Sequence, residues 1–207
     1  MQDEVQPIAD VCLDGSQKLD VNKWRSCLTL PIDYTPQNVV MRMGIDAAPS
    51  ANPDSDESAI AVGHFYDAEP WPGLALVDCV GGRWRGWALP QKIVDLIDLW
   101  KIEEVSIECN RQHGGDLLLD AIKHIANDRD IAIPTIVAFS ANNKWGAKAS
   151  RARRIESDFI DGGLLKIRSA GFVDRLFDEV EKFTFDRENH GRLDSRLDAV
   201  SFLANLR

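Results

Sequence analysis

Acidic residues occur at three places in this sequence where the surrounding apolar pattern does not require them. Asp46 ends the apolar run VVMRMGID, and Glu108 lies inside the run VSIEC. Asp194 and Asp198 are four positions apart near the C-terminus, so on a helix they share one face. A lone buried carboxylate is costly unless a cation or hydrogen-bond donors compensate its charge. If these acids are gathered in space, they are candidate ligands of a hard divalent cation such as Mg²⁺ or Mn²⁺.

Two such ions, about 3.5–4 Å apart, activate a water molecule and stabilise the leaving oxygen when a phosphodiester bond is cleaved. His190 and Asp56 are auxiliary candidates, and His190 would serve as a further ligand or a proton carrier. Each residue also has an ordinary interpretation. An aspartate after a strand is commonly a turn former, one that starts a helix is commonly an N-cap, and loop residues commonly face solvent.

The elements that must position these acids follow an α/β pattern. We expect strands at 39–46, 58–67 and 74–80, with the short connections that are typical of antiparallel hairpins. Two later strands, at 104–110 and 131–139, alternate with helices, which favours parallel pairing. The sequence therefore predicts an α/β fold with a mixed sheet, three antiparallel strands and then parallel strands, flanked by helices.

The predicted strand order would bring the acids together. If the first and fourth strands are adjacent and parallel, Asp46 and Glu108 meet at one edge of the sheet. The final helix, over about 194–206, would then present Asp194 and Asp198 from its first turn. Without a metal ion, a salt bridge from a nearby Lys or Arg could replace the cation.

Residues 1–37 differ from the rest of the chain. They contain Pro7, Pro31 and Pro36 and show no sustained period of 2 or 3.6. We interpret them as a linker or as an arm packed on the domain, and we interpret 38–207 as one domain.

Several segments resemble the nuclease domain of tailed-phage terminase large subunits, over about residues 39–207. The resemblance implies a ribonuclease H-like fold that cuts concatemeric viral DNA during genome packaging. It also implies that Asp46, Glu108 and one or both of Asp194 and Asp198 hold two Mg²⁺ or Mn²⁺ ions. The similar segments are GIDAA (44–48), SAIAV (58–62), IEC (107–109), KASRARRIESDFIDGGLLKI (148–167) and LDSRLDAVSFL (193–203).

The chain departs from this family at one position of the motif. Many members have two adjacent acids before the Asp-Ala pair, whereas here Ser195 occupies the second place. Which of Asp194 and Asp198 is the main ligand therefore stays open, and we favour Asp194 because it is nearer the start of the helix.

The resemblance implies double-stranded DNA as the substrate. It also implies the terminase ATPase half, the small terminase subunit and the portal as partners, in the host cytoplasm. The sequence has no G-x-x-x-x-G-K-[ST] motif, and WGAKAS at 145–150 lacks the spacing of a phosphate cradle. We therefore interpret the chain as a nuclease domain that does not translocate DNA by itself.

The charge balance limits how the protein contacts DNA. With 24 Lys and Arg against 33 Asp and Glu, the net charge of -9 argues against binding nucleic acid or membranes by bulk charge. One segment, 144–154, holds five cations and no acid, and we predict that it contacts DNA phosphates. The alternative is a solvated helix face on which Arg154 pairs with Asp158. The five cations are Lys144, Lys148, Arg151, Arg153 and Arg154.

Other features argue against secretion, zinc binding and membrane insertion. The four cysteines form no C-x-x-C pair, so we expect free thiols in a reducing compartment. No apolar leader segment is evident at the N-terminus, and the longest uncharged apolar run, 131–141, is about half a membrane span. Trp71, Trp84 and Trp87 surround a Gly-rich turn, where we expect packing in a hairpin core rather than contact with DNA.

Three other functions are alternatives to the terminase interpretation. A Holliday-junction resolvase or a transposase-type nuclease shares the fold and the carboxylate set. A non-catalytic interaction domain would use the same acids structurally. An actin-like ATPase also begins with a strand that ends in Asp, but it needs a second phosphate loop and a larger fold than this chain offers.

Overall fold

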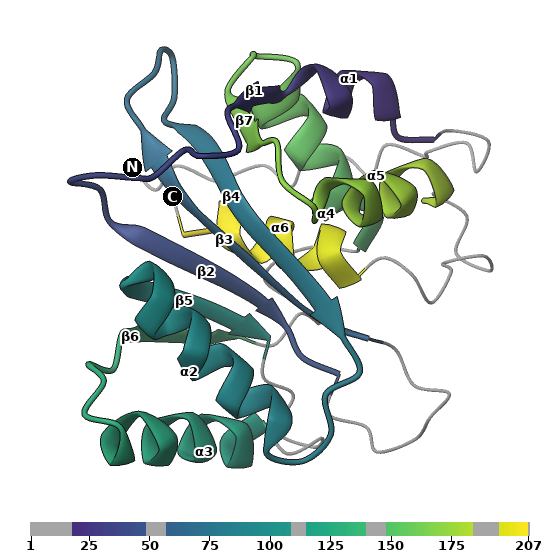
Figure 1. Ribbon diagram of the computed structural model, residues 1–207. Coiled ribbons are helices and arrows are strands. Elements are labelled where there is room, and N and C mark those ends of the chain that lie inside the picture. The colour runs from purple at the N-terminus through teal and green to yellow at the C-terminus, as the bar shows by residue number, and fades with distance from the viewer. Residues whose placement is uncertain (1–17, 49–56, 109–114, 140–147, 184–194, 207) are drawn as a thin grey trace, which may run out of the picture.

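A seven-stranded mixed sheet forms the centre of the protein, in the order β1-β7-β4-β3-β2-β5-β6 (Figure 1). A computed structural model describes residues 18–48, 57–108, 115–139, 148–183 and 195–206. Its strands are β1 (Leu28–Leu30), β2 (Met41–Asp46), β3 (Ser58–Tyr66), β4 (Gly73–Gly82), β5 (Ile102–Glu108), β6 (Thr135–Phe139) and β7 (Leu165–Arg168).

The strand directions confirm the predicted fold class, an α/β fold with a mixed sheet of three antiparallel strands and then parallel strands. Strands β2, β3 and β4 pair antiparallel in series. Strand β5 pairs parallel with β2, and β6 pairs parallel with β5. The helices between these later strands supply the crossovers that parallel pairing requires. The first and fourth predicted strands, β2 and β5, are therefore neighbours.

Helices cover both faces of this sheet (Figure 1). One face carries α2 and α3, and the other carries α6 with α4, α5 and α1. The helices are α1 (Val21–Ser26), α2 (Ala88–Trp100), α3 (Gly115–Asp128), α4 (Lys148–Ile155), α5 (Val173–Lys182) and α6 (Ser195–Ala204), and a π-helical turn, η2 (Glu156–Ile160), follows α4. None of the helices in the described part of the chain is long and apolar enough to cross a membrane.

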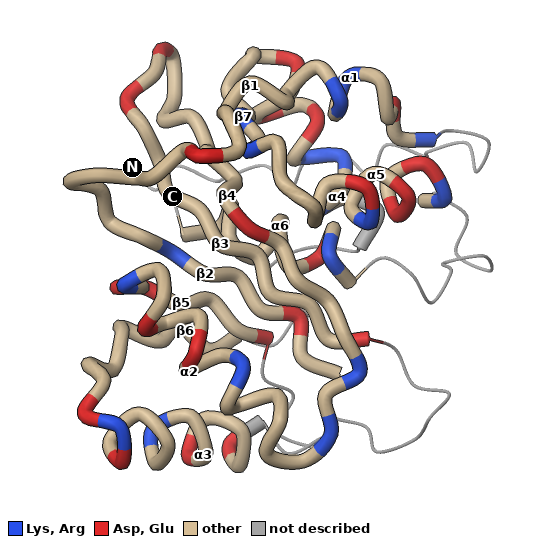
Figure 2. Tube along the Cα trace, viewed as in Figure 1, with Lys and Arg blue, Asp and Glu red and all other residues tan. Residues whose placement is uncertain are grey.

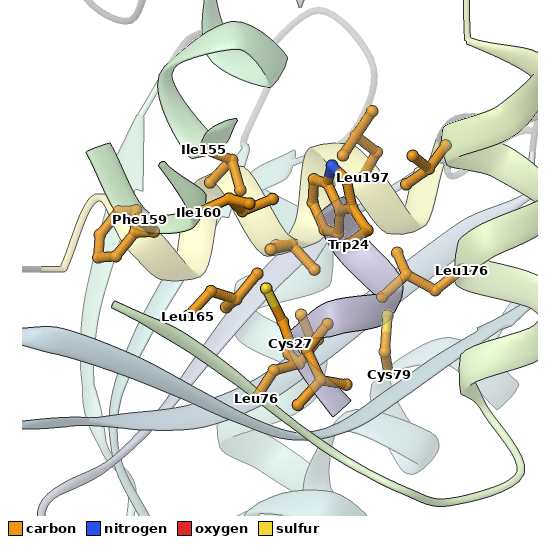
Figure 3. Packing of buried hydrophobic residues seen from close by; sticks show 14 of the residues in the cluster. Trp24, Cys27, Leu76, Cys79, Ile155, Phe159, Ile160, Leu165, Leu176 and Leu197 are labelled. Atoms are coloured by element: carbon orange, nitrogen blue, oxygen red, sulfur yellow. The ribbon is translucent and has the colours of Figure 1, made fainter. Parts of the chain in front are cut away.

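Part of the predicted arm is built into the sheet. Helix α1 is capped by Asp20, which accepts a hydrogen bond from the Asn22 amide at 2.9 Å, and β1 pairs with β7. The Trp24 side chain is fully buried and lies near Leu197 in the core (Figure 3). Elements of six and three residues are too short to produce a visible period. Where the domain begins within residues 1–37 stays a prediction, because 1–17 lie outside the described residues.

Two other expectations need correction. Strand β6 begins at Thr135 rather than at 131, after Pro134, which has no amide hydrogen to donate to a sheet. Trp71 and Trp87 are 56% and 58% exposed, so the expectation of core packing is wrong for them. Both rings lie outside the sheet strands, in the connections before β4 and α2.

Helix α6 rests directly on the backbone of β2. A Cβ atom at Gly44 would lie 2.2 Å from the Ala199 carbonyl oxygen and 2.3 Å from the Leu203 nitrogen. No side chain fits in that space, so glycine is required there for the close approach. As a result, α6 is buried on all sides from Ser195 to Leu203.

We predict that Gly44→Ala lowers the free energy of unfolding by about 3 kcal/mol or more, at the upper end of the usual cost of overpacking. The added methyl group meets backbone atoms, which cannot rotate away. Urea denaturation measures the change, and amide exchange should show that α6 loses protection. Gly171→Ala is the control: no atom lies within 4 Å of its added Cβ, and its effect should stay within about 0.5 kcal/mol. Equal stability of the two variants would contradict this account of α6.

Candidate functional site

Asp46 and Glu108 end two adjacent parallel strands on the same face of the sheet. The register pairs Ile45 of β2 with Ile107 of β5, and one acid follows each of these residues. Both isoleucines belong to the core under α2 and α3. Because successive side chains alternate across a strand, Asp46 and Glu108 face the α6 side. Both are half-buried.

The first turn of α6 begins at this edge of the sheet. The Ser195 hydroxyl donates a hydrogen bond to the Glu57 carbonyl oxygen at 2.7 Å, and Glu57 immediately precedes β3. Two residues further on, Ala59 pairs with Asp46 across the β2–β3 ladder. Asp198 lies in the first turn of this helix and is buried.

Asp198 forms a buried ion pair with Arg151 of α4. The Arg151 Nη2 atom donates to Asp198 Oδ1 at 2.9 Å, and each side chain is 8% exposed. The guanidinium also lies 5.3 Å from the centroid of the Phe202 ring. Phe202 in turn contacts Phe139 edge-to-face, with ring centroids 4.8 Å apart, and Phe139 pairs in register with Glu108. This chain of contacts places Asp198 on the side of α6 nearer Glu108.

A second buried ion pair holds the other side of the α6 start. Glu179 of α5 pairs with Arg196 Nη1 at 2.5 Å and accepts a hydrogen bond from the Arg196 amide at 2.8 Å. It therefore satisfies an amide that a helix start leaves without an internal partner. Burial raises the pKa of Glu179, although the hydrogen bonds and charge of Arg196 oppose the rise. The Arg196 guanidinium lies over Gly81, where a Cβ would approach within 2.5 Å of its Cζ atom.

These contacts define one row across the α6 face of the sheet. Gly81 of β4 pairs with Ala59 of β3, which pairs with Asp46. Glu108 continues the row beyond Asp46. Arg196 lies at the β4 end of this row, over Gly81, and Arg151 contacts Asp198 and Phe202 of α6.

The Glu179–Arg196 pair is not among the residues predicted from the sequence, although the sequence contains a signal for it. Leu176 and Val180 form part of the apolar stripe of α5, and Glu179 stands on the same face as Leu176, three positions later. An acid on the apolar face of a helix needs a buried partner. No spacing rule identified that partner as Arg196, which belongs to another helix.

The basic segment divides between the interior and the surface. Arg151 and Ile155 are four residues apart and both are buried, so Arg151 is not on the exposed face that we predicted to contact phosphates. Arg154 is exposed and lies 3.9 Å from Asp158, the pairing considered as the alternative. Arg153 pairs with Glu156 at 3.4 Å. Lys148 begins α4. Lys144, Asp56, His190 and Asp194 lie outside the described residues.

The donor chemistry at this edge fits a hard divalent cation. Asp46 and Glu108 supply carboxylate oxygens on one face, as Mg²⁺ and Mn²⁺ prefer. Within the described ranges, no group of three or more His, Cys, Asp or Glu residues is placed to hold a metal ion. The predicted third ligand is Asp194, which lies outside the described residues, or Asp198, which is paired with Arg151. Their role as ligands stays a prediction.

The described cysteines are free thiols in the core. Cys27 and Cys79 are both buried and unpaired with each other. Burial raises the pKa of the Cys27 thiol to about 11 and raises that of Cys79 further. Both thiols are therefore protonated at neutral pH and are poor metal ligands.

No protein-family model matches the chain, and no curated protein matches its sequence. Among solved structures, fowlpox virus resolvase in complex with Holliday junction DNA has a TM-score of 0.45 and 11% identity, covering 81% of this chain and 99% of that chain. Thermus thermophilus RuvC has a TM-score of 0.40 and 10% identity, covering 79% of this chain and 90% of that chain. At such low similarity, the fold class rests on the strand order and directions described above.

Removing Glu179 should destabilise the α6 start strongly. We expect Glu179→Ala to lower the free energy of unfolding by about 3–5 kcal/mol, because Arg196 would keep a buried charge without this partner. Asp98→Ala is the matched control, since it breaks the exposed Lys101–Asp98 pair and should cost no more than about 1 kcal/mol. Urea denaturation measures both. Similar values for the two variants would mean that the buried pair does not support α6.

Proposed function

We propose that this chain is a divalent-metal-dependent endonuclease that hydrolyses phosphodiester bonds of DNA. One observation carries the proposal: Asp46 and Glu108 end adjacent parallel strands, side by side, on the face where α6 begins. Two neighbouring carboxylates repel each other, and a divalent cation bound between them offsets that repulsion. Because β2 and β5 are held side by side by strand pairing and packing, the free energy of folding offsets the repulsion between the two carboxylates.

The roles follow from position. Asp46 and Glu108 bind the cations, and Asp194 or Asp198 completes the set. When bound, two divalent cations supply a water of lowered pKa and stabilise the leaving oxygen. His190 and Asp56 remain auxiliary candidates for a further ligand or a proton carrier.

In this proposal, only a limited part of the protein surface contacts DNA. A net charge of -9 opposes general binding to phosphates, so cations near the site must position the backbone. Arg153 and Arg154 meet this requirement among the described cations of the segment, because both are at least partly exposed on α4. Lys144 and Lys148 belong to the same basic segment.

Two DNA substrates are compatible with the carboxylate pair. A terminase-like enzyme cuts concatemeric duplex, acts in the host cytoplasm and depends on an ATPase half, a small subunit and a portal. A resolvase cuts four-way junctions and needs none of these partners. The structures of the fowlpox and Thermus proteins include complexes with Holliday junction substrates, so a four-way junction belongs in every assay.

The first test of the proposal is cleavage. We expect the protein to nick supercoiled plasmid or a labelled four-way junction in Mn²⁺ or Mg²⁺ and to be inactive in EDTA. Asp46→Asn and Glu108→Gln should each reduce the rate at least about a hundredfold, the scale of losing one transition-state stabiliser. Glu104→Gln is the matched control, because Glu104 lies on β5 and pairs with Arg42. The control should keep its activity.

Each pattern of cleavage has a distinct meaning. Preference for the junction supports a resolvase, and equal or better cutting of linear duplex supports a terminase-like nuclease. Equal cutting with and without EDTA, or full activity of Asp46→Asn, would refute the metal site. If no substrate is cut although Mn²⁺ binds, the domain is non-catalytic.

A further test concerns the basic helix. We predict that replacing Arg153 and Arg154 with Ala weakens DNA binding and reduces the slope of log K against log salt by about 1 per lost phosphate contact. Fluorescence anisotropy at several salt concentrations measures the slope. Lys101→Ala, at the exposed end of α2, is the control and should leave it unchanged. An unchanged slope in the α4 variant would show that this face is only solvated.

A further inference from the structure

A cavity lies between the starts of helices α2 and α3, lined by Trp84 and Trp87 on one side and by α3 on the other. We infer that this cavity binds an unpaired nucleobase of a DNA strand that passes over the edge of the sheet to Asp46 and Glu108. The ligand is thus a DNA strand with at least one unpaired base. This inference rests on the proposed function, because it takes that edge as the place where DNA is bound.

Aromatic and apolar side chains line most of this cavity, whose volume is about 660 Å³. Sites that bind small molecules are commonly about 300–1,000 Å³. Trp87 and Leu117 line the cavity although they are 58% and 76% exposed. Leu117, Ala121 and His124 follow one another at the spacing of a single helix face, so α3 presents one continuous side to the cavity. Exposed apolar surface of this kind commonly marks a place where another molecule binds.

The register of the sheet places the cavity close to the candidate carboxylate site. Strands β2 and β4 are both antiparallel to β3, and Gly81 of β4 lies in the same row as Asp46. Two strand spacings, or about 10 Å in all, separate these two residues. A Cβ atom at Gly82, the next residue, would lie 3.0 Å from the Trp84 ring, which packs against the core under α2 and α3. The cavity and the acids therefore share one edge of the sheet and lie on opposite faces of it.

Figure 1 shows the same arrangement, because the end of α2 that follows β4 lies beside α3. A DNA strand that is bound at the acids needs to cross only the ends of β3 and β4 to reach the cavity.

Positive charge alternates with aromatic rings in the connection from β4 to α2, which is partly blue in Figure 2. In the sequence RWRGW at 83–87, Arg83 and Arg85 are both exposed. Helix α2 begins directly after this segment, so the partial positive charge of its N-terminus adds to theirs. An anionic ligand that carries flat apolar rings matches this combination of charge and shape, and a nucleotide is such a ligand.

The α3 side of the cavity supplies polar groups that suit the edge of a base. Asp120 accepts hydrogen bonds, and the His124 ring donates or accepts them according to its tautomer. The Trp87 and His124 rings are inclined at 60°, with centroids 6.3 Å apart, so they do not stack face to face on each other. Because Asp120 repels phosphate, the base should lie toward α3 and the phosphates toward Arg85.

Fluorescence anisotropy in EDTA tests the inference without metal and without cleavage, using labelled single-stranded DNA and a blunt duplex of the same sequence. Trp87→Ala should weaken single-strand binding about tenfold, the scale of losing one base–aromatic stack, and should weaken duplex binding much less. Trp87→Phe keeps an aromatic ring and should retain most of the affinity. Trp71→Ala is the matched control, because Trp71 is similarly exposed but precedes β4, at the opposite end of that strand. It should leave single-strand binding unchanged.

A second pair of variants covers the case in which Trp87→Ala folds poorly. Leu117 lies in the first turn of α3, where the helix dipole favours an acid, so Leu117→Glu should fold normally. Its charge adds to that of Asp120 and should weaken single-strand binding about fivefold at low salt, the scale of one unit charge about 4 Å away in water. Leu99→Glu is the control, because Leu99 is exposed near the far end of α2.

Several results would overturn the inference. They are absence of single-strand binding by the unmodified chain, unchanged binding by both Trp87→Ala and Leu117→Glu, and an equal loss on duplex, which would indicate a general phosphate-binding surface. Sedimentation tests a further occupant, a second copy of the chain. If Trp87→Ala dissociates a dimer while its DNA binding is unchanged, the cavity is an interface between copies and the inference is wrong.

Failure of the inference and failure of the proposed function give different results. The expected binding pattern in EDTA, without cleavage of any substrate in Mn²⁺ or Mg²⁺, supports the nucleobase cavity and refutes the nuclease. Metal-dependent cleavage with unchanged binding by Trp87→Ala and Leu117→Glu supports the nuclease and refutes the nucleobase cavity.

Discussion

The close approach of α6 to β2 at Gly44 is the contact on which the arrangement of this protein depends. Because Gly44 has no side chain, the backbone of the helix lies against the backbone of the strand. The helix crosses the middle of the sheet at that point, and its first turn is carried to the strand ends where Asp46 and Ala59 pair. A larger residue would separate the acid in the helix from the acids in the strands.

Two buried ion pairs then determine how the charges near the α6 start are balanced. Arg196 with Glu179 holds the helix end to α5, and Arg151 with Asp198 holds its first turn to α4. Both pairs are deep enough that loss of one partner leaves a costly charge. The edge of the sheet where α6 begins carries Asp46 and Glu108, each half-buried. Within each of these two ion pairs, a buried negative charge therefore has a positive partner.

The charges of the protein are unevenly distributed over its elements. Figure 2 shows that charged residues lie mainly on the helices and at strand ends, whereas the middle of the sheet is largely uncharged. The arginines of α4 differ in exposure. Arg151 is buried and pairs with Asp198, whereas Arg154 faces solvent. One short helix thus contributes both a buried ion pair to the first turn of α6 and an exposed positive charge to the surface.

The sequence by itself determined most strands and helices, the antiparallel and parallel halves of the sheet, and the positions of Asp46 at the end of one strand and of Glu108 within another. Those features follow from local periodicity and from the rule that parallel strands need crossovers. Only the tertiary structure decided that Arg151 turns inward to Asp198, 47 positions away, and that Glu179 holds Arg196, 17 positions away. It also decided that α1 and β1 complete the sheet. Pairing of distant charges depends on how helices pack in three dimensions, and no pattern along the chain records that packing.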